Sequence, residues 1–98
     1  MALTLPFVSP GLINEMAAAI RVNVTEHSSQ EITSLIQAGA ADLNRQGVDN
    51  IDLADPLTKQ ALKLYCKAHY GYDQNVDRFL MAYEALSAGM SLSGDYDL

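Results

Sequence analysis

The chain has 98 residues, of which 49% are hydrophobic and 18% charged, as expected for one small globular domain. Twelve acidic and six basic residues give a net charge of −6, which disfavours tight binding to duplex DNA, because such a protein has to neutralise phosphates. The single cysteine excludes an intrachain disulfide, and we expect neither a secretory signal peptide nor a membrane span.

The first predicted helix begins at Pro10. Ser9 is a residue type that caps helices, and proline suits the first helical position because it has no amide hydrogen to leave unpaired. Four residues recur at helical spacing and should form its buried face: Leu12, Met16, Ala19 and Ile20. Residues 21–25 alternate apolar and polar side chains without a partner strand, so they are interpreted as an extended connector.

A second helix is predicted from Ser28, because Ser28 and Glu31 have the spacing of a capping box. Its expected core face consists of Ile32, Leu35, Ile36, Gly39, Ala40 and Leu43. Small residues around Gly39 should allow another helix to approach closely, and Gly47 should terminate this one. Residues 48–54 then form a loop.

The third predicted helix has the clearest start, because Asp55 can cap it and Pro56 suits its first position. It should run to Tyr70. Its expected buried face consists of Leu57, Ala61, Leu64, Tyr65 and Ala68. The three lysines at intervals of four lie on the opposite side: Lys59, Lys63 and Lys67. This amphipathic helix is predicted to be the main support of the core.

A fourth helix should follow a cap at Asp73 or Asn75 and end near Gly89. The side chains expected to be buried on it are Val76, Phe79, Leu80, Tyr83 and Leu86. Residues 91–98 are acidic and aperiodic, which is typical of a mobile tail. The sequence therefore predicts an all-α fold, with a bundle of about four helices in residues 1–90 and a C-terminal tail in residues 91–98.

No motif indicates catalysis or a bound cofactor. Cys66 and His69 lie three residues apart, but a zinc site needs further ligands that the sequence does not place nearby, so no metal site and no enzymatic activity are expected. The candidate functional residues are instead possible protein contacts: Lys59, Lys63, Lys67, Tyr70, Tyr72, Leu92 and Tyr96. A solvated lysine face, tyrosines that only fill the core and a disordered tail are the alternative interpretations.

The order of the segments resembles the small head-tail connector proteins of tailed bacteriophages, also called adaptor or head completion proteins, in particular those of prophages. The matching segments are Arg21-Val22-Asn23, the alanine-rich residues 32–43, Asp55-Pro56-Leu57, residues 65–72, Tyr83-Glu84-Ala85-Leu86 and residues 91–96. They cover nearly the whole chain, although none is a catalytic motif. The loop of residues 47–54 matches no pattern of the family.

The resemblance implies a non-enzymatic structural protein of the phage neck, assembled in the host cytoplasm. Its subunits would form a homo-oligomeric ring that docks on the portal protein, extends the DNA channel and receives the next neck or tail-completion protein. An acidic channel would repel DNA phosphates, so the DNA would pass without specific binding. The alternative is a small acidic regulator or inhibitor that binds another protein as a monomer or dimer. A helix-turn-helix DNA binder is disfavoured by the net charge.

Overall fold

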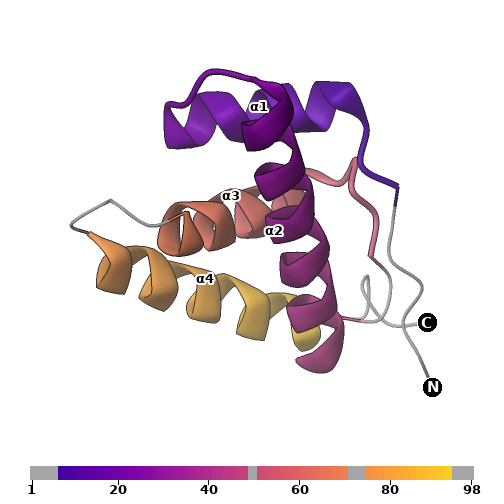
Figure 1. Cartoon of the computed structure of the whole chain (residues 1–98). Coiled ribbons are helices and arrows are strands. Elements are labelled where there is room, and N and C mark those ends of the chain that lie inside the picture. The colour runs from indigo at the N-terminus through magenta and orange to yellow at the C-terminus, as the bar shows by residue number, and fades with distance from the viewer. Residues whose placement is uncertain (1–6, 49–50, 71–74, 94–98) are drawn as a thin grey trace.

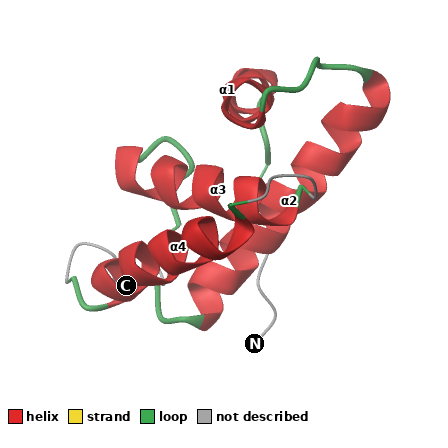
Figure 2. Cartoon of the chain, turned by 90° about the vertical axis from the view of Figure 1, so that its left-hand side faces the viewer, coloured by secondary structure: helices red, strands yellow, loops and turns green. Residues whose placement is uncertain are grey.

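The structure is a computed structural model that describes residues 7–48, 51–70 and 75–93. These ranges contain four helices and no strand: α1 (Pro10–Ile20), α2 (Glu26–Arg45), α3 (Pro56–His69) and α4 (Val76–Ser91). In Figure 1, α1 lies above α3, α4 lies below it, and α2 crosses in front. Helix α3 contacts the other three helices and occupies the centre, as the turned view in Figure 2 also shows. The predicted all-α fold is confirmed.

Residues next to helix α1 in the sequence determine where it begins and ends. The Oγ atom of Ser9 accepts a hydrogen bond of 3.2 Å from the amide of Leu12, as predicted for an N-cap. The buried residues are Leu12, Met16, Ala17 and Ile20. The prediction of Ala19 was wrong, because the buried side of α1 is turned toward Ala17 by contacts with both α2 and α3. Arg21 then adopts a left-handed conformation with φ of 59° and ends the helix.

Helix α2 begins at Glu26, two residues earlier than predicted. The capping box is formed by Thr25 and Ser28: the Thr25 hydroxyl accepts from the Ser28 amide at 3.1 Å, and the Ser28 hydroxyl accepts from the Thr25 amide at 2.8 Å. The Ser28 hydroxyl also donates to the carbonyl of Asn23 at 2.8 Å. This pair displaces the predicted pair of Ser28 and Glu31, because the earlier start lets Ser28 serve both the helix and the connector.

The core face of α2 follows its predicted periodicity. Ile32, Ile36, Gly39, Ala40 and Leu43 are buried, and Leu35 packs against the core while half-buried. The close approach predicted at Gly39 is confirmed. A Cβ atom placed at Gly39 would lie 2.8 Å from the Cδ2 atom of Leu62 and 3.2 Å from the ring of Tyr65, so α3 packs against the bare backbone there. Gly47 follows α2 with φ of 107°, a conformation that favours glycine.

Helix α3 starts as predicted, with an Asp55 carboxylate oxygen accepting from the Thr58 amide at 2.9 Å, and it ends at His69. Its buried face differs from the expectation. The buried residues are Thr58, Ala61, Leu62, Cys66 and Ala68. Leu57 is 48% exposed, whereas Leu64 and Tyr65 are half-buried and pack against the core. A helix surrounded by three others buries a broader and differently placed surface than a one-sided amphipathic pattern predicts.

Helix α4 continues through Gly89 to Ser91, so the predicted end was wrong. The continuation places Met90 in the core with 2% exposure, and burial of this side chain outweighs the lower helix propensity of glycine. Tyr83 and Ser87 are the other buried residues of α4. The remaining predicted core positions are only half-buried: Val76, Phe79, Leu80 and Leu86. Asp73 and residues 94–98 lie outside the described residues.

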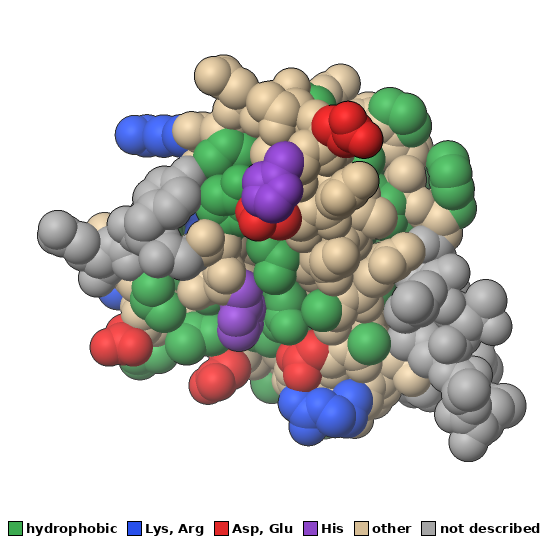
Figure 3. All heavy atoms as spheres, viewed as in Figure 1, with side chains coloured by type: hydrophobic (Ala, Val, Ile, Leu, Met, Phe, Trp, Pro, Cys, Tyr) green, Lys and Arg blue, Asp and Glu red, His purple; other side chains and the backbone are tan. Residues whose placement is uncertain are grey.

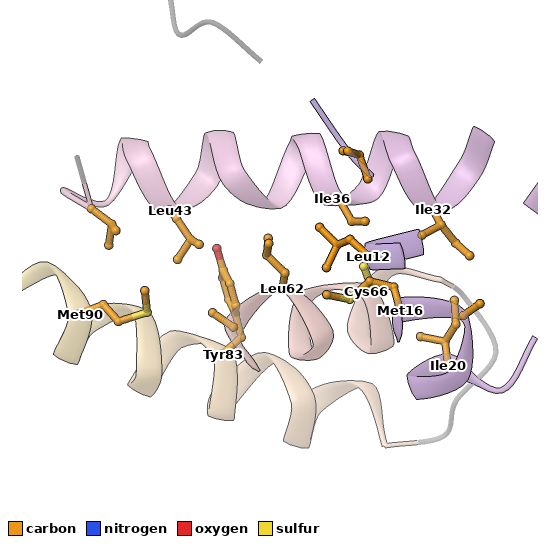
Figure 4. Close-up of a cluster of buried hydrophobic side chains, with 14 residues drawn as sticks. Leu12, Met16, Ile20, Ile32, Ile36, Leu43, Leu62, Cys66, Tyr83 and Met90 are labelled. Carbon is orange, nitrogen blue, oxygen red and sulfur yellow. The ribbon is translucent and has the colours of Figure 1, made fainter. Parts of the chain in front are cut away.

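The core lies where the four helices meet. Figure 4 shows side chains from all four helices pointing toward one another: Leu12, Met16, Ile20, Ile32, Ile36, Leu43, Leu62, Cys66, Tyr83 and Met90. The two residues of α3 in this set, Leu62 and Cys66, are fully buried at the centre. Within the described ranges, no helix is both long and apolar enough to cross a membrane.

Candidate protein interface

The three lysines of α3 lie between α1 and α4. The Nζ atom of Lys59 is 3.2 Å from a carboxylate oxygen of Glu15 on α1. The Nζ atom of Lys67 lies 5.4 Å from the centre of the Phe79 ring on α4. All three lysines are half-buried, and Lys63 is placed between the other two. The row therefore contacts neighbouring helices at its ends. Among the described residues, Lys59 alone of the three forms an ion pair, Lys67 lies over an aromatic ring, and Lys63 makes neither kind of contact.

The four other predicted contact residues fall into two groups. Tyr70, the C-cap residue of α3, is half-buried and packs against the core, while Leu92, the C-cap residue of α4, is 88% exposed. Tyr72 and Tyr96 lie outside the described residues. Of the predicted apolar and aromatic contacts, Leu92 therefore offers the largest accessible surface in the described part of the chain.

A shallow groove runs beside Tyr70, between the first turns of α2 and the last turn of α3. Its lining residues are His27, Gln30, Glu31, Ser34, Leu35, His69 and Tyr70. The Nε2 atom of His27 lies 3.0 Å from a carboxylate oxygen of Glu31, and the His69 ring stacks on Tyr65 with ring centres 4.2 Å apart. Figure 3 shows both histidines on this face of the molecule. The sequence analysis did not single out His27, whose spacing of four from Glu31 was the available signal.

A polar network links α2 to α4. Asp42 accepts hydrogen bonds from the Tyr83 hydroxyl, from Arg45 at 2.6 Å and from Gln46 at 2.7 Å. The Ser87 hydroxyl donates to Gln46 at 2.8 Å. Burial would raise the pKa of Asp42, but the hydrogen bonds from Tyr83, Arg45 and Gln46 outweigh it and hold that pKa below its usual value. The network fixes the relative position of the two helices.

The same network gives Tyr83 two roles. Its ring fills the core with 3% exposure and meets the Tyr65 ring edge-on, with ring centres 5.3 Å apart. Burial, and next the hydrogen bond to Asp42, raise the pKa of Tyr83, so its hydroxyl remains a donor at neutral pH. The sequence analysis placed Tyr83 in the core but missed its partner, which lies 41 positions away.

Cys66 and His69 do not form a reactive pair. Cys66 is fully buried, and burial raises the pKa of its thiol to about 12, whereas His69 is exposed. The expected buried face of α3 did not include Cys66, but the surrounding helices enclose that side of α3. In the described part of the chain, no group of three or more His, Cys, Asp and Glu side chains could hold a metal ion.

These features define a small helical protein in which Leu92 is exposed and the three lysines of α3 are partly exposed. Comparison with known families identifies it further: the family model described as phage connector protein matches residues 12–97. The match begins within α1 and continues through α2, α3 and α4, so the chain belongs to this family, and the resemblance based on the sequence is confirmed. No curated protein and no solved structure matches the chain.

Proposed function

We propose that this protein is a non-enzymatic structural subunit of the head-tail connection in a tailed phage, located in the virion neck. Copies of the chain form a ring that docks on the portal protein, extends the DNA channel and receives the next neck or tail-completion protein. The match to the phage connector family over residues 12–97 carries this proposal. The net charge of −6 supports it, because an acidic ring lets DNA pass without binding it.

The lysine row and Leu92 are the proposed contact residues within the described part. Lys63 has no ion-pair partner there, and Leu92 exposes most of its side chain. Lysines that are weak individually act together when they face an acidic surface. Tyr70 packs against the core, and its accessible part is proposed to contribute to the contact surface. Tyr72 and Tyr96 are proposed to add aromatic contacts to the partner.

Binding to a purified portal ring of the same phage tests the function directly. Replacement of Lys59, Lys63 and Lys67 by glutamine should weaken docking at least about tenfold, and added salt should weaken docking of the parent protein. Replacement of the same three lysines by arginine preserves the charge and is the matched control. If the parent protein does not bind the portal ring and instead binds a different protein as a monomer or dimer, the proposed neck function is refuted and a role as a regulator is favoured.

A further inference from the structure

The outward side of α4 is apolar over three turns. Met81, Ala85, Ala88 and Leu92 fall within a sector of about 60° at 100° per residue. All four are exposed, Met81 by 71% and Leu92 by 88%. They lie opposite Tyr83, Ser87 and Met90, the residues that α4 buries. We call these four residues the α4 outer face. The α4 outer face therefore presents two large apolar side chains, with two alanines between them, to the solvent.

The charges beside the α4 outer face are asymmetric. Asp77 and Glu84 lie on one flank of α4, and Glu84 lines a groove there together with Asp42 and Arg45 of α2. Figure 3 shows acidic side chains near α4 on this side of the molecule. On the opposite flank, the exposed Arg78 lies next to Ala85 by helical spacing, and the Phe79 ring, which Lys67 covers, lies further toward the buried side. The acidic flank and the lysine row are therefore separated by the width of α4.

A surface of matching character lies on α3. Leu57, Gln60, Lys63, Leu64 and Lys67 occupy one sector of that helix, which is outside its buried face. We call these five residues the α3 outer face. It combines two apolar side chains, seven residues and about 10 Å apart, with two lysines. Met81 and Ala88 on α4 have the same spacing, so the two faces can align along their helices.

We propose that the α4 outer face of one copy packs against the α3 outer face of a second copy. Met81 and Ala88 then lie against Leu57 and Leu64, while the acidic flank of α4 meets the lysines of the neighbouring α3. The contact buries Met81 and Leu57, which are exposed in the single chain, together with the accessible part of Leu64, and it pairs opposite charges at their edge.

A two-fold contact between two α4 outer faces is disfavoured in its antiparallel form. Such a contact places the same flank of each helix together, so Asp77 and Glu84 would face their own copies. Like charges so placed are repulsive. A contact between two different faces instead leaves one α4 outer face and one α3 outer face free on every pair of subunits. Further copies can therefore add through the same contact, and a ring forms when the rotation between successive subunits adds up to a full turn. This inference rests on the proposed function and specifies which surfaces join the subunits.

Complementary variants test the inference. Ala85→Glu blocks the α4 outer face, Lys63→Glu blocks the α3 outer face, and Ala18→Glu is the matched control on an exposed alanine of α1. Each blocking variant should raise the dissociation constant for self-association at least about tenfold, as measured by sedimentation velocity up to millimolar concentration, while the control should match the parent. An equimolar mixture of the two blocking variants should form a 1:1 pair and nothing larger, because each supplies one intact face.

Two outcomes overturn the inference. One is a parent chain that remains monomeric at millimolar concentration; the other is a Lys63→Glu variant that assembles like the parent. Circular dichroism and melting should show that the variants are folded, and Gln60→Glu replaces Lys63→Glu if the latter unfolds, because Gln60 is exposed. Portal binding by the parent chain separates this result from the proposed function. If the parent docks but the two variants do not pair, only the assigned surfaces are refuted; if the variants pair but the parent does not dock, the role in the neck is refuted.

Discussion

Gly39 and Gly89 both lie inside helices, but their surroundings differ. A Cβ atom at Gly39 would meet Leu62 at 2.8 Å and the Tyr65 ring at 3.2 Å, whereas a Cβ atom at Gly89 would have no neighbour within 4 Å. Both glycines adopt helical backbone conformations that alanine also adopts, since neither has a positive φ. Replacement of each glycine by alanine should change the helix propensity equally at the two positions. Only the replacement at Gly39 also changes the tertiary packing, so a comparison of the two variants separates the two effects on stability.

The expected changes in the free energy of unfolding follow from these distances. Gly89→Ala should stabilise the protein by about 0.5–1 kcal/mol, because alanine is the better helix former and its methyl group enters open space. Gly39→Ala gains a similar amount from propensity but overpacks the contact with Leu62, at a cost of about 1–3 kcal/mol. The Gly39 variant should therefore range from nearly neutral to about 2 kcal/mol less stable than the parent, always below the Gly89 variant.

Urea unfolding followed by circular dichroism measures both variants against the parent at low protein concentration. The difference between the two variants is the cost of the tertiary contact and should be about 1–3 kcal/mol. This is a large fraction of the stability of a small domain. If Gly39→Ala proves as stable as Gly89→Ala, the close approach of α3 to the backbone of α2 is incorrect.

Two further predictions concern the core and the network between α2 and α4. Leu62→Ala should lower the free energy of unfolding by about 2–5 kcal/mol and Leu64→Ala by clearly less, because Leu62 is fully buried and Leu64 half-buried; equal losses in urea unfolding would contradict the orientation of α3. Tyr83→Phe should cost about 1–3 kcal/mol at pH 7 through loss of a hydrogen bond to a charged group. Because the pKa of Asp42 is lowered in the folded protein, its stabilisation is present above the ordinary value of 3.8 and is lost as the pH falls through the folded pKa. The difference between the parent and Tyr83→Phe should therefore shrink below about pH 4, and a difference that stays constant down to pH 2 would refute this role of the network.

Much of the candidate interface could be identified from the sequence. The three lysines are spaced four residues apart, which placed them on one side of α3. The lack of helical periodicity in residues 91–98 indicated a tail that contains Leu92. The α4 outer face was missed, because Met81 and the alanines around it read as ordinary members of an apolar helix. Only the packing of α4 shows which of its apolar residues are left exposed.

The sequence by itself determined the number of helices, most of their starts and the buried face of α2. Caps such as Asp55 act through hydrogen bonds to amides three residues away, and the face of α2 follows its own periodicity, so local residues suffice. Only the tertiary structure decided the orientation of α3, the continuation of α4 through Gly89 and the partnership of Asp42 with Tyr83. These features depend on which surfaces neighbouring helices cover, and those neighbours are distant in the chain.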